Sequence, residues 1–296
     1  MQAGNANPGR KTGMRFGPPS GPAGRLTSLE IEAKNRSLFC RSGFVQQTQR
    51  IWYPLPFFLC HLFALLIYGS WLFEPTRALW NTLDSELFFL LNGLLANGDP
   101  WPTFWAAANT KAADIVTGLV MILFFFIFIF TGPKTLRIER LSMFGIMSGM
   151  ILLSQDGGLV DLYSRIIAVV RPSPSLVLEP VYRLSELVPH IKAKDAAYSS
   201  FPGDHGIVTM IWVGCIWFFA SWRWGVAATL IGALILLPRM VAGAHWLSDN
   251  MVGSSLLALL MVAWILCTPL TYYLQRLGIW VLGFILPRSW GTTQQA

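Results

Sequence analysis

Six long apolar stretches constrain the fold of this chain more than any other feature of its sequence. A helix needs about 20 predominantly apolar residues to cross the hydrocarbon core of a bilayer, and only helices or closed barrels satisfy every backbone polar group there. The sequence therefore predicts an all-α fold, that of a polytopic membrane protein with six transmembrane helices. The predicted spans are residues 54–73, 114–131, 141–160, 206–222, 225–238 and 248–268. The fifth is short unless it extends to residue 242.

The composition agrees with a membrane protein. Hydrophobic residues make up 54% of the 296 residues and charged residues only 12%, which is about half the charged share of an average soluble domain. The first apolar stretch begins near residue 54, too far along the chain for a secretory signal peptide. The four cysteines form no C-x-x-C pair. We therefore expect neither a disulfide framework nor a metal site, and no cofactor.

Residues 1–50 differ from the rest of the chain. They contain eight Lys or Arg residues and two Glu residues, which gives this segment a net charge of +6 (8 − 2) out of +7 for the whole chain. Many Gly, Pro, Asn and Ser residues and few large apolar ones predict a mostly disordered cytoplasmic tail. Such a tail fits contact with anionic membrane lipid better than binding to nucleic acid. A six-span domain then covers residues 51–275, and a cytoplasmic C-terminal segment covers 276–296.

The positions of Lys and Arg in the short loops set the orientation of the predicted helices. Besides the tail, basic residues lie between the second and third spans, between the fourth and fifth, and near the C-terminus: Lys134, Arg137, Arg140, Arg223, Arg276 and Arg288. With six spans all of these lie on one side, which we predict to be cytoplasmic. The loop 161–205 and the turn 239–247 then share the opposite face. That loop is itself basic, against the usual bias, which suggests an anionic ligand.

The segment DSELFFLLNGLL, residues 84–95, lies between the first two predicted spans. It has a half-polar pattern and is too short to cross a bilayer. We predict that it lies at the membrane interface, and the sequence assigns no functional residue to it.

Three motifs on the non-cytoplasmic face carry candidate chemistry. VVRPSP contains Arg171, SFPGDHG contains His205, and PRMVAGAHWLSDN contains Arg239, His245 and Asp249. His245 and Asp249 are four residues apart, which places them on one face of a helix. Asp249 can therefore accept a hydrogen bond from one ring nitrogen of His245 and leave the other free to attack an electrophile.

The same motifs hold groups suited to binding an anion. Both histidines lie at predicted helix starts, where free backbone N–H groups and the helix dipole favour negative charge; Gly203 has no side chain to keep an anion from its own N–H. Arg171 and Arg239 supply planar donor forks that match phosphate. Together with the histidines and Asp249 they indicate metal-free phosphoryl transfer through a phosphohistidine. Asp204 is either part of this phosphate site or a first-turn carboxylate that only stabilises its helix.

The pattern R-P, then P-x-x-H, then R-x5-H-x3-D resembles the type 2 phosphatidic acid phosphatase superfamily, whose members are six-span enzymes that act on lipid phosphates. The resemblance implies that His245 is the nucleophile, that Asp249 is its partner and that His205 is the general acid and base. It also implies that Arg171 and Arg239 bind the phosphate.

Two departures from the superfamily pattern narrow the match. Ser164, next to Arg165, stands where the superfamily usually has Lys, and the usual P-S-G-H is Pro202-Gly203-Asp204-His205 here. The segments KDAAYSSFPGDHG, PRMVAGAHWLSD, CTPL and NTKAAD are similar to those of the lipid A phosphotransferases within that superfamily. This resemblance covers roughly residues 54–275 and leaves out the basic tail.

The narrower resemblance implies a complete reaction at the periplasmic face of the inner membrane, among the lipids of that membrane. The distal phosphate of undecaprenyl diphosphate moves to a phosphate of lipid A, with the 1-phosphate as the expected acceptor. Further candidates for substrate binding are Lys111, Asp114, Arg165 and Lys194. The alternative is a phosphatase that hydrolyses undecaprenyl diphosphate or another lipid phosphate, and the sequence alone leaves the choice open.

Gly203 and Asp204 bear on that choice. Asp204 places a carboxylate next to His205 and favours its imidazolium form. An imidazolium protonates a leaving group but cannot take a proton from attacking water, whereas a lipid A phosphate is already ionised and needs little base catalysis. We therefore predict that these two residues favour transfer over hydrolysis.

Overall fold

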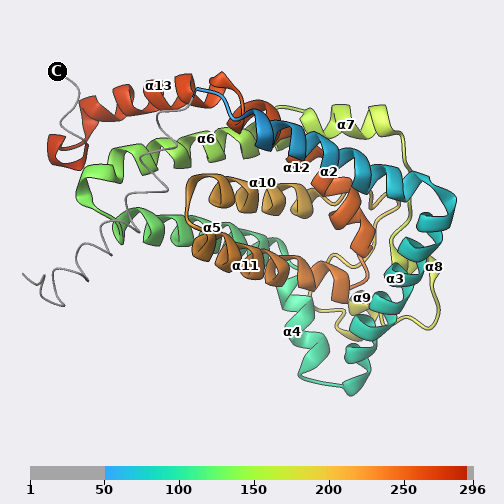
Figure 1. The fold of residues 1–296 in the computed structure, drawn as a ribbon. Coiled ribbons are helices and arrows are strands. Elements are labelled where there is room, and N and C mark those ends of the chain that lie inside the picture. The colour runs from blue at the N-terminus through green and yellow to red at the C-terminus, as the bar shows by residue number, and fades with distance from the viewer. Residues whose placement is uncertain (1–50, 292–296) are drawn as a thin grey trace, which may run out of the picture. The chain divides into compact units, whose positions relative to one another are not determined.

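The computed structural model of the protein describes residues 51–291 (Figure 1). Within this part the chain forms helices joined by loops and no β-strand, which confirms the predicted all-α membrane fold. The described residues belong to one compact unit, residues 43–296. The predictions for the basic tail 1–50 and for residues 292–296 lie outside the described residues.

Helices α2 to α13 follow one another, with short 3₁₀- and π-helices between them. The longer helices are α2 (Pro54–Leu72), α3 (Glu74–Asn92), α5 (Lys111–Phe130), α6 (Arg137–Gln155), α10 (Asp204–Phe219), α11 (Trp222–Val241) and α13 (Pro269–Ile285). The shorter ones are α4 (Trp101–Ala108), α7 (Leu159–Ile167), α8 (Pro174–Val177), α9 (Leu184–Leu187) and α12 (Ser255–Met261). Two π-helices, η3 (Asp249–Ser254) and η4 (Val262–Leu266), extend α12 at its two ends. The 3₁₀-helices are η1 (Gly93–Asn97), η2 (Lys134–Leu136) and η5 (Arg288–Trp290).

All six predicted spans are helical, but their number is not confirmed. Four helices in the described part are long and apolar enough to cross a membrane: α2, α5, α11 and the continuous helix Asp249–Leu266. The third predicted span falls in a pair of helices, Lys134–Gln155 and Leu159–Ile167, that meet at 49°. Gly158 lies at this bend with a φ of 75°, outside the helical region. The fourth predicted span is the 16-residue helix α10, which is about 24 Å long and shorter than a typical hydrocarbon core.

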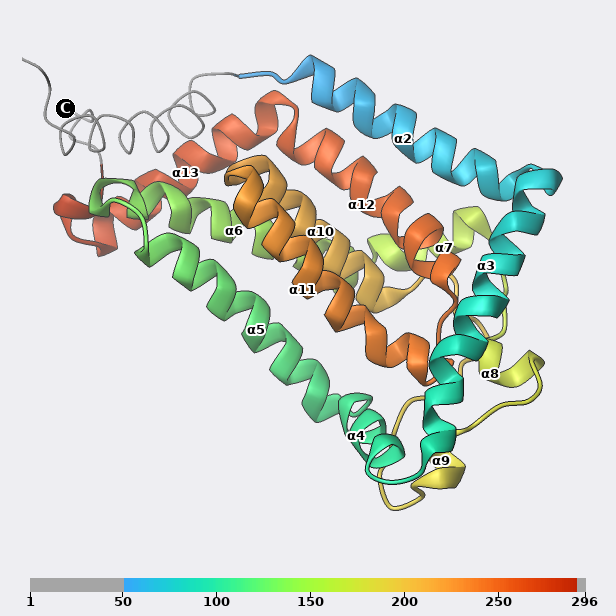
Figure 2. The ribbon, with the colours of Figure 1, turned by 60° about the horizontal axis from the view of Figure 1, so that its bottom comes forward.

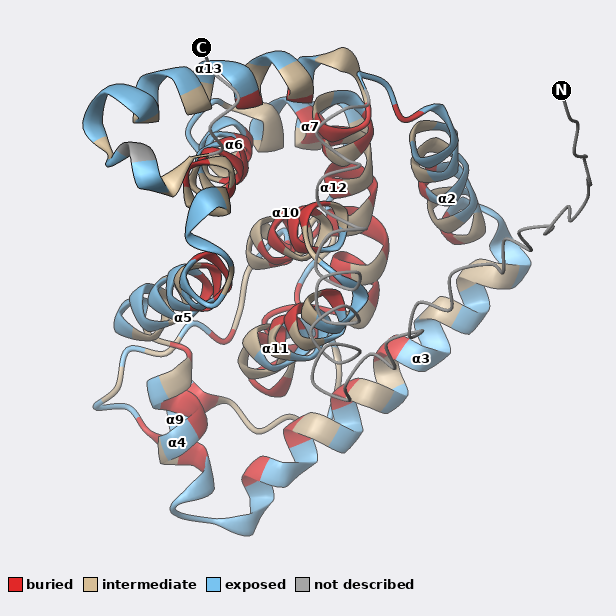
Figure 3. Ribbon diagram, turned by 60° about the vertical axis from the view of Figure 1, so that its left-hand side comes forward, coloured by how far each residue is buried: buried red, intermediate tan, exposed pale blue. Residues whose placement is uncertain are grey.

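Helix α10 forms the centre of the bundle. It packs against α6, α11 and α12, and Figure 3 shows it enclosed by its neighbours. Its side chains Ile211, Trp212 and Cys215 are completely buried. The apolar stretch of α2 is only 11% buried, against 67% for Asp249–Leu266. Helix α2 therefore turns most of its surface outward, toward lipid.

Helix α3 contains most of the segment predicted to lie at the interface and begins ten residues before it (84 − 74). It runs beside the ends of the central helices and packs against α2 and α11 (Figure 2). One face of α3 is buried, at Asp84, Phe88 and Asn92. Asn92 fixes this helix in place, because its Nδ2 donates to the carbonyl oxygens of Tyr182 and Val241, each at 3.0 Å. Helix α3 thus brings a buried carboxylate to this end of the bundle.

Helix α13 crosses the predicted boundary between residues 275 and 276. Its start is well defined, since Pro269 occupies the first turn and the Thr268 side chain accepts a hydrogen bond from a backbone N–H of that turn. The helix packs against α6, where the hydroxyl of Ser142 donates to the carbonyl of Gln275 at 3.0 Å. Residues 276–285 therefore continue a helix of the bundle and do not start a separate segment.

Candidate active site

Residues of the three sequence motifs meet at one end of the bundle, where α10 begins and α11 ends. Asp204 and His205 are the first two residues of α10, and Arg239 lies in the last turn of α11. Two hydrogen bonds join the first motif to the second. Ser200 donates from its backbone N–H and from its hydroxyl to the carbonyl oxygen of Arg171, at 2.7 and 3.0 Å.

Four basic and four acidic side chains form one continuous network here. In order along the network they are Arg239, Asp114, His205, Asp204, His245, Asp249, Arg171 and Asp84. Each neighbouring pair lies within 3.5 Å, and basic and acidic groups alternate. Charges in a poorly solvated place are tolerated when each has an opposite charge beside it. An incoming anion must therefore compete with these carboxylates for the basic groups.

His245 is buried, with 5% of its side chain exposed, and its two ring nitrogens have different surroundings. Nδ1 lies 2.9 Å from the carbonyl oxygen of Ser200, so it carries a hydrogen and donates it there. Nε2 is buried and has no hydrogen-bond partner among the described residues. Oδ1 of Asp204 lies 3.5 Å from it. Because Nδ1 holds a proton, Nε2 is the nitrogen available to attack an electrophile.

The charge state of His245 depends on its two acidic neighbours. Burial disfavours the charged ring, but the attraction of Asp204 and Asp249 outweighs burial and raises the pKa of His245 to about 9. At neutral pH the resting ring is therefore an imidazolium. It becomes a nucleophile only after it loses the Nε2 proton, so attack should become faster as the pH approaches 9.

Asp249 lies beside His245 in a geometry that the sequence did not predict. Its Oδ2 is 3.5 Å from Nδ1 of His245, but the hydrogen of Nδ1 points to Ser200, and Oδ2 instead accepts from the N–H of Trp246 at 2.9 Å. A helical i, i+4 contact between His245 and Asp249 requires one helix through both residues. His245 precedes the helix, and Asp249 begins a π-helix. Asp249 therefore acts on His245 through its charge.

Arg171 is held by Asp84, a residue that the sequence did not assign to the site. Nη2 of Arg171 lies 2.8 Å from Oδ2 of Asp84, and Nη1 lies 2.6 Å from the hydroxyl of Ser248. Asp84 also accepts from the backbone N–H and the hydroxyl of Ser248, at 2.8 and 2.6 Å. The guanidinium stacks on Trp246, 4.3 Å from the ring centroid. The Asp84 side chain is fully buried, so this half of the network is rigid and shielded from water.

Arg239 is held in the same manner by Asp114. Nη2 of Arg239 lies 2.7 and 3.0 Å from the two oxygens of Asp114. Nη1 lies 3.4 Å from the carbonyl oxygen and from Oδ1 of Asn109. Arg239 is buried, but 37% of the Asp114 side chain is exposed. Asp114 therefore lies where solvent and substrate can reach it.

His205 lies between two carboxylates. Its Nδ1 is 2.8 Å from Oδ1 of Asp204 and its Nε2 is 3.0 Å from Oδ1 of Asp114. An imidazolium donates to both oxygens at once, whereas a neutral ring donates to one. Nη2 of Arg239 lies 3.2 Å from the same Nε2 and favours a neutral ring. Nε2 of His205 therefore has an acceptor, Asp114, and a donor, Arg239, at similar distances.

A cavity of about 230 Å³ opens beside this exposed half of the network. Asp114, Asp204 and His205 form its polar part, and residues of α5, α6, α10 and α11 complete it. Lys194 reaches the rim, with Nζ 3.7 Å from Oδ2 of Asp204. Burial raises the pKa of Asp204, but the two histidines and Lys194 outweigh burial and hold it well below its usual range. An ionised carboxylate therefore stands between the cavity and Nε2 of His245.

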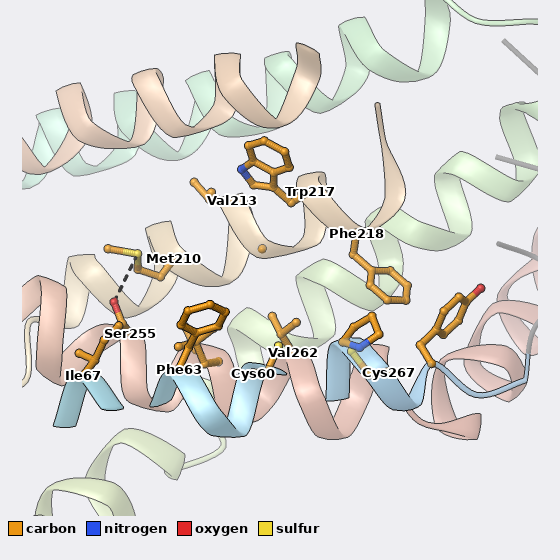
Figure 4. Close-up of a pocket in the computed structure, with 15 residues that line it drawn as sticks. Cys60, Phe63, Ile67, Met210, Val213, Trp217, Phe218, Ser255, Val262 and Cys267 are labelled. Carbon is orange, nitrogen blue, oxygen red and sulfur yellow. Dashed lines mark hydrogen bonds between the residues drawn. The ribbon is translucent and has the colours of Figure 1, made fainter. Parts of the chain in front are cut away.

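Larger cavities of the protein lie away from this chemistry. Figure 4 shows an apolar groove of about 600 Å³ between α2, α10 and α12, where the hydroxyl of Ser255 contacts the sulfur of Met210. A second apolar groove of about 650 Å³ lies between α6 and the segment around α13. No member of the charged network lines either groove. Cavity size therefore does not identify the site, and the charged groups do.

Gly203 has a packing role in place of the predicted anion-binding role. Its N–H donates to the carbonyl oxygen of Asp249 at 3.3 Å, so it is not free to bind an anion. A Cβ at Gly203 would lie 2.5 Å from Oδ1 of Asn250, and a Cβ at Gly206 would lie 2.4 Å from the same atom. Glycine at both positions lets the start of α10 approach η3 closely.

Two predicted substrate-binding residues lie apart from the network. Lys111 is the first residue of α5 and Arg165 lies on α7, and both are exposed. No hydrogen bond or ion pair among the described residues joins either of them to the network. The one sequence signal for Asp84 is a carboxylate at the start of the segment 84–95, which also contains Glu86, and the half-polar pattern of an interfacial segment explains both residues.

Comparison with known proteins shows the family of the chain. The model of the PAP2 superfamily matches residues 167–274, a range that contains the whole network except Asp84 and Asp114. A curated relative, the lipid A 1-diphosphate synthase of Escherichia coli (strain K12), is 30% identical over 217 residues. These residues cover 72% of this chain and 87% of the relative. No solved structure gives a significant match.

Proposed function

Because the chain belongs to the PAP2 superfamily, we propose that it is a phosphotransferase that moves the distal phosphate of undecaprenyl diphosphate onto the 1-phosphate of lipid A. The proposal rests on Nε2 of His245, a buried nitrogen without a hydrogen-bond partner among the described residues. It belongs to a charged network that also contains two arginines and a second histidine. The printed name of the relative supports lipid A as the acceptor. The sequence resemblance supports undecaprenyl diphosphate as the donor.

In the first step His245 loses its Nε2 proton to solvent, and the neutral Nε2 then attacks the distal phosphorus of the donor. The N–P bond forms as the bridging P–O bond breaks, and undecaprenyl phosphate leaves. Arg171 and Arg239 donate hydrogen bonds to the phosphoryl oxygens as their charge grows, which is the main form of catalysis in phosphoryl transfer. His205, as an imidazolium, donates a proton to the leaving oxygen and takes one back from solvent before the second step.

In the second step a phosphate oxygen of lipid A attacks the phosphorus of phospho-His245. The N–P bond breaks, a new phosphoanhydride forms and His245 is regenerated. One anhydride is broken and one is made, so the overall transfer is close to thermoneutral. A donor that carries its own anhydride suits the periplasmic face of the inner membrane, where ATP is absent.

The surroundings of His205 favour transfer over hydrolysis. Water must lose a proton to attack, and an imidazolium at His205, with both ring nitrogens donating to carboxylates, has no lone pair free to accept that proton. The lipid A phosphate is already ionised and needs no base. Asp204 thus supports the transferase over the phosphatase, which uses the same residues.

The product distinguishes the two activities. The purified chain in detergent is given radiolabelled undecaprenyl diphosphate, with and without lipid A. We expect label on lipid A and little free phosphate when lipid A is present, and slow release without it. Free phosphate at an equal rate under both conditions would identify a phosphatase and overturn the proposal.

The proposed orientation needs its own test. Cysteine at residue 190, in the loop that carries Lys194, should react with an impermeant thiol reagent in intact spheroplasts, because the Lys and Arg of the short loops place that face outside. Cysteine at residue 135 should not react. The reverse pattern would place the site in the cytoplasm and remove the reason for a lipid donor.

A further inference from the structure

The cavity of about 230 Å³ beside the charged network extends along α5 beyond the residues that the proposed reaction uses. Four residues of α5 line it: Asp114, Thr117, Gly118 and Met121. Positions i, i+3, i+4 and i+7 share one face of a helix, and this face is about 10 Å long. A Cβ at Gly118 would meet no atom within 4 Å, so open space lies over this part of α5. The cavity therefore has room for a part of a substrate other than the phosphate.

Three uncharged polar side chains line this cavity with unused hydrogen-bonding capacity. The hydroxyls of Thr117 on α5 and Thr209 on α10 make no hydrogen bond with any residue of the described part, 51–291. Nε2 of Gln155, the last residue of α6, lies 3.5 Å from the hydroxyl of Ser154, and its amide oxygen accepts no hydrogen bond within the same range. A polar group without a partner costs free energy in apolar surroundings. These three side chains therefore need water or a ligand in the cavity.

Packing fixes the orientation of Thr209. Only 2% of the residue is exposed, and a Cβ added at Gly232 of α11 would lie 2.9 Å from its Cγ2, so the methyl group faces α11. Its Oγ1 is not one of the fully enclosed unpaired atoms of the described residues. The hydroxyl of Thr209 therefore reaches the cavity that this residue lines.

The charged residues of the cavity suit an uncharged group better than a phosphate. Two of them are the carboxylates Asp114 and Asp204, and the one basic residue, His205, already lies 3.0 and 2.8 Å from them. Carboxylates repel a phosphate but accept hydrogen bonds from hydroxyl groups. Oδ1 of Asp204 also lies 3.5 Å from Nε2 of His245. A group bound in the cavity is therefore a neighbour of the nitrogen that carries the phosphoryl group in the proposed reaction.

The hydrogen-bonding groups of the cavity distinguish between the two proposed substrates. An isoprenoid diphosphate carries such groups only in its diphosphate, whereas a sugar phosphate carries ring hydroxyl or amide groups next to its phosphate. The cavity has roughly the volume of eight water molecules in the liquid, which suits one sugar unit and is too small for a whole lipid. Its polar side chains therefore match the acceptor.

We propose that Thr117, Gln155 and Thr209 bind the hydroxyl or amide groups of the sugar that carries the acceptor phosphate. This inference rests on the proposed function and names the residues that select its acceptor. They are binding residues and take no part in bond making or breaking.

The test measures the binding of two lipids to the purified full-length chain in detergent, by native mass spectrometry and without a donor. Lipid A presents a phosphorylated sugar, whereas phosphatidic acid presents a phosphate monoester without a sugar. The double variant Gln155→Leu with Thr209→Val should weaken lipid A binding by about 10-fold or more, because it removes two hydrogen-bonding groups. It should leave phosphatidic acid binding within about 2-fold.

Matched variants separate the loss of a hydroxyl from a change of shape. Thr209→Ser keeps the hydroxyl, and Thr82→Val removes the hydroxyl of an exposed threonine of α3 that does not line the cavity. Both should bind lipid A as the wild type does. Gly118→Leu places a side chain in the open part of the cavity, so it should weaken lipid A binding more than phosphatidic acid binding.

The outcomes separate this inference from the proposed function, because none of these measurements needs turnover. An equal fall for both lipids in the double variant would mean that the two side chains only support the shape of the site, and unchanged lipid A binding would mean that they only hold water. Either result overturns the inference. If lipid A binding falls selectively but the wild type transfers no phosphate to lipid A, the proposed reaction fails and the sugar site stands.

Discussion

The two halves of the charged network use the same pairing but differ in burial. Arg171 lies 2.8 Å from Asp84 and Arg239 lies 2.7 Å from Asp114. The Asp84 side chain is fully buried, whereas 37% of Asp114 and 44% of Asp204 are exposed. A cavity of about 10 Å³ lies beside Asp84 in the buried half, whereas the exposed half borders a cavity of about 230 Å³.

His245 belongs to both halves, and the difference between them explains its asymmetry. Its Nδ1 faces the buried side, through Ser200 and Asp249, and its Nε2 faces the exposed carboxylate of Asp204. Breaking a buried ion pair costs several kcal/mol, but an exposed pair contributes at most about 1 kcal/mol. We therefore expect the buried half to hold the nucleophile in place. In the exposed half, we expect a substrate phosphate to replace the carboxylates as the partner of the basic groups.

The largest expected effect comes from removing the residue that joins the two halves. His245→Ala should lower transfer by at least about 10³-fold, because no other side chain of the site is placed to carry the phosphoryl group. Acid-labile, base-stable labelling of the protein by radiolabelled donor should vanish with it. His190→Ala, at an exposed histidine outside the network, is the control. Label that persists in His245→Ala would reject it as the nucleophile.

The second prediction compares the halves directly through stability. Asp84→Ala leaves the buried part of Arg171 and the N–H of Ser248 without their acceptor, so it should lower the free energy of unfolding by about 3–5 kcal/mol. Asp204→Ala removes a half-exposed carboxylate and should lower it by no more than about 1 kcal/mol. Thermal denaturation of both variants in the same detergent checks this. Equal losses would show that the two halves do not differ.

The sequence predicted the reactive residues better than the contacts that hold them. Arg171, His205, Arg239, His245 and Asp249 stand in local motifs, and the structure brings all five into one network. The carboxylates that pair with the two arginines, Asp84 and Asp114, come from helices far away in the chain. The residues around an Asp in such a segment do not indicate which arginine its carboxylate will contact in the folded protein.

The fold shows the same division between local and non-local information. Apolar stretches predicted every central helix, because each stretch is visible in its own residues. They did not predict that α10 ends after 16 residues or that Gly158 bends the third span, since these depend on the neighbouring helices and on one backbone angle. The sequence did not predict the packing role of Gly203 for a similar reason: the close approach of Asn250 depends on how α10 and η3 pack.

A smaller effect is expected from the charge on the buried side of His245. Asp249→Asn keeps an acceptor for the N–H of Trp246 but removes the negative charge 3.5 Å from Nδ1. In a serine-type triad the same change costs about 10⁴-fold because it reverses the histidine tautomer. Here the carbonyl of Ser200 fixes the tautomer, so we expect a loss of only about 10- to 100-fold in kcat/KM. A loss near 10⁴-fold would mean that Asp249, not Ser200, sets the tautomer.

The smallest expected effect is a shift in the pH dependence set by the exposed side. The charged or polar groups that face His245 are Asp204 at the start of α10, Asp249 in η3 and the carbonyl of Ser200. The pKa of His245 is raised to about 9, so the neutral nucleophile is scarce at pH 7 and kcat/KM should rise with pH up to about 9.

Asp204→Asn removes one of the two charges that raise this pKa. The rising limb should therefore move to lower pH, and activity at pH 7 relative to pH 9 should increase by a few-fold. Lys194→Gln removes one of the other two partners of the Asp204 carboxylate, and no ion pair joins Lys194 to His245, so this change should leave the limb nearly in place. If the rising limb of Asp204→Asn coincides with that of the wild type, the exposed carboxylate does not control the pKa of His245. The proposed difference in role between the buried half and the exposed half would then be wrong.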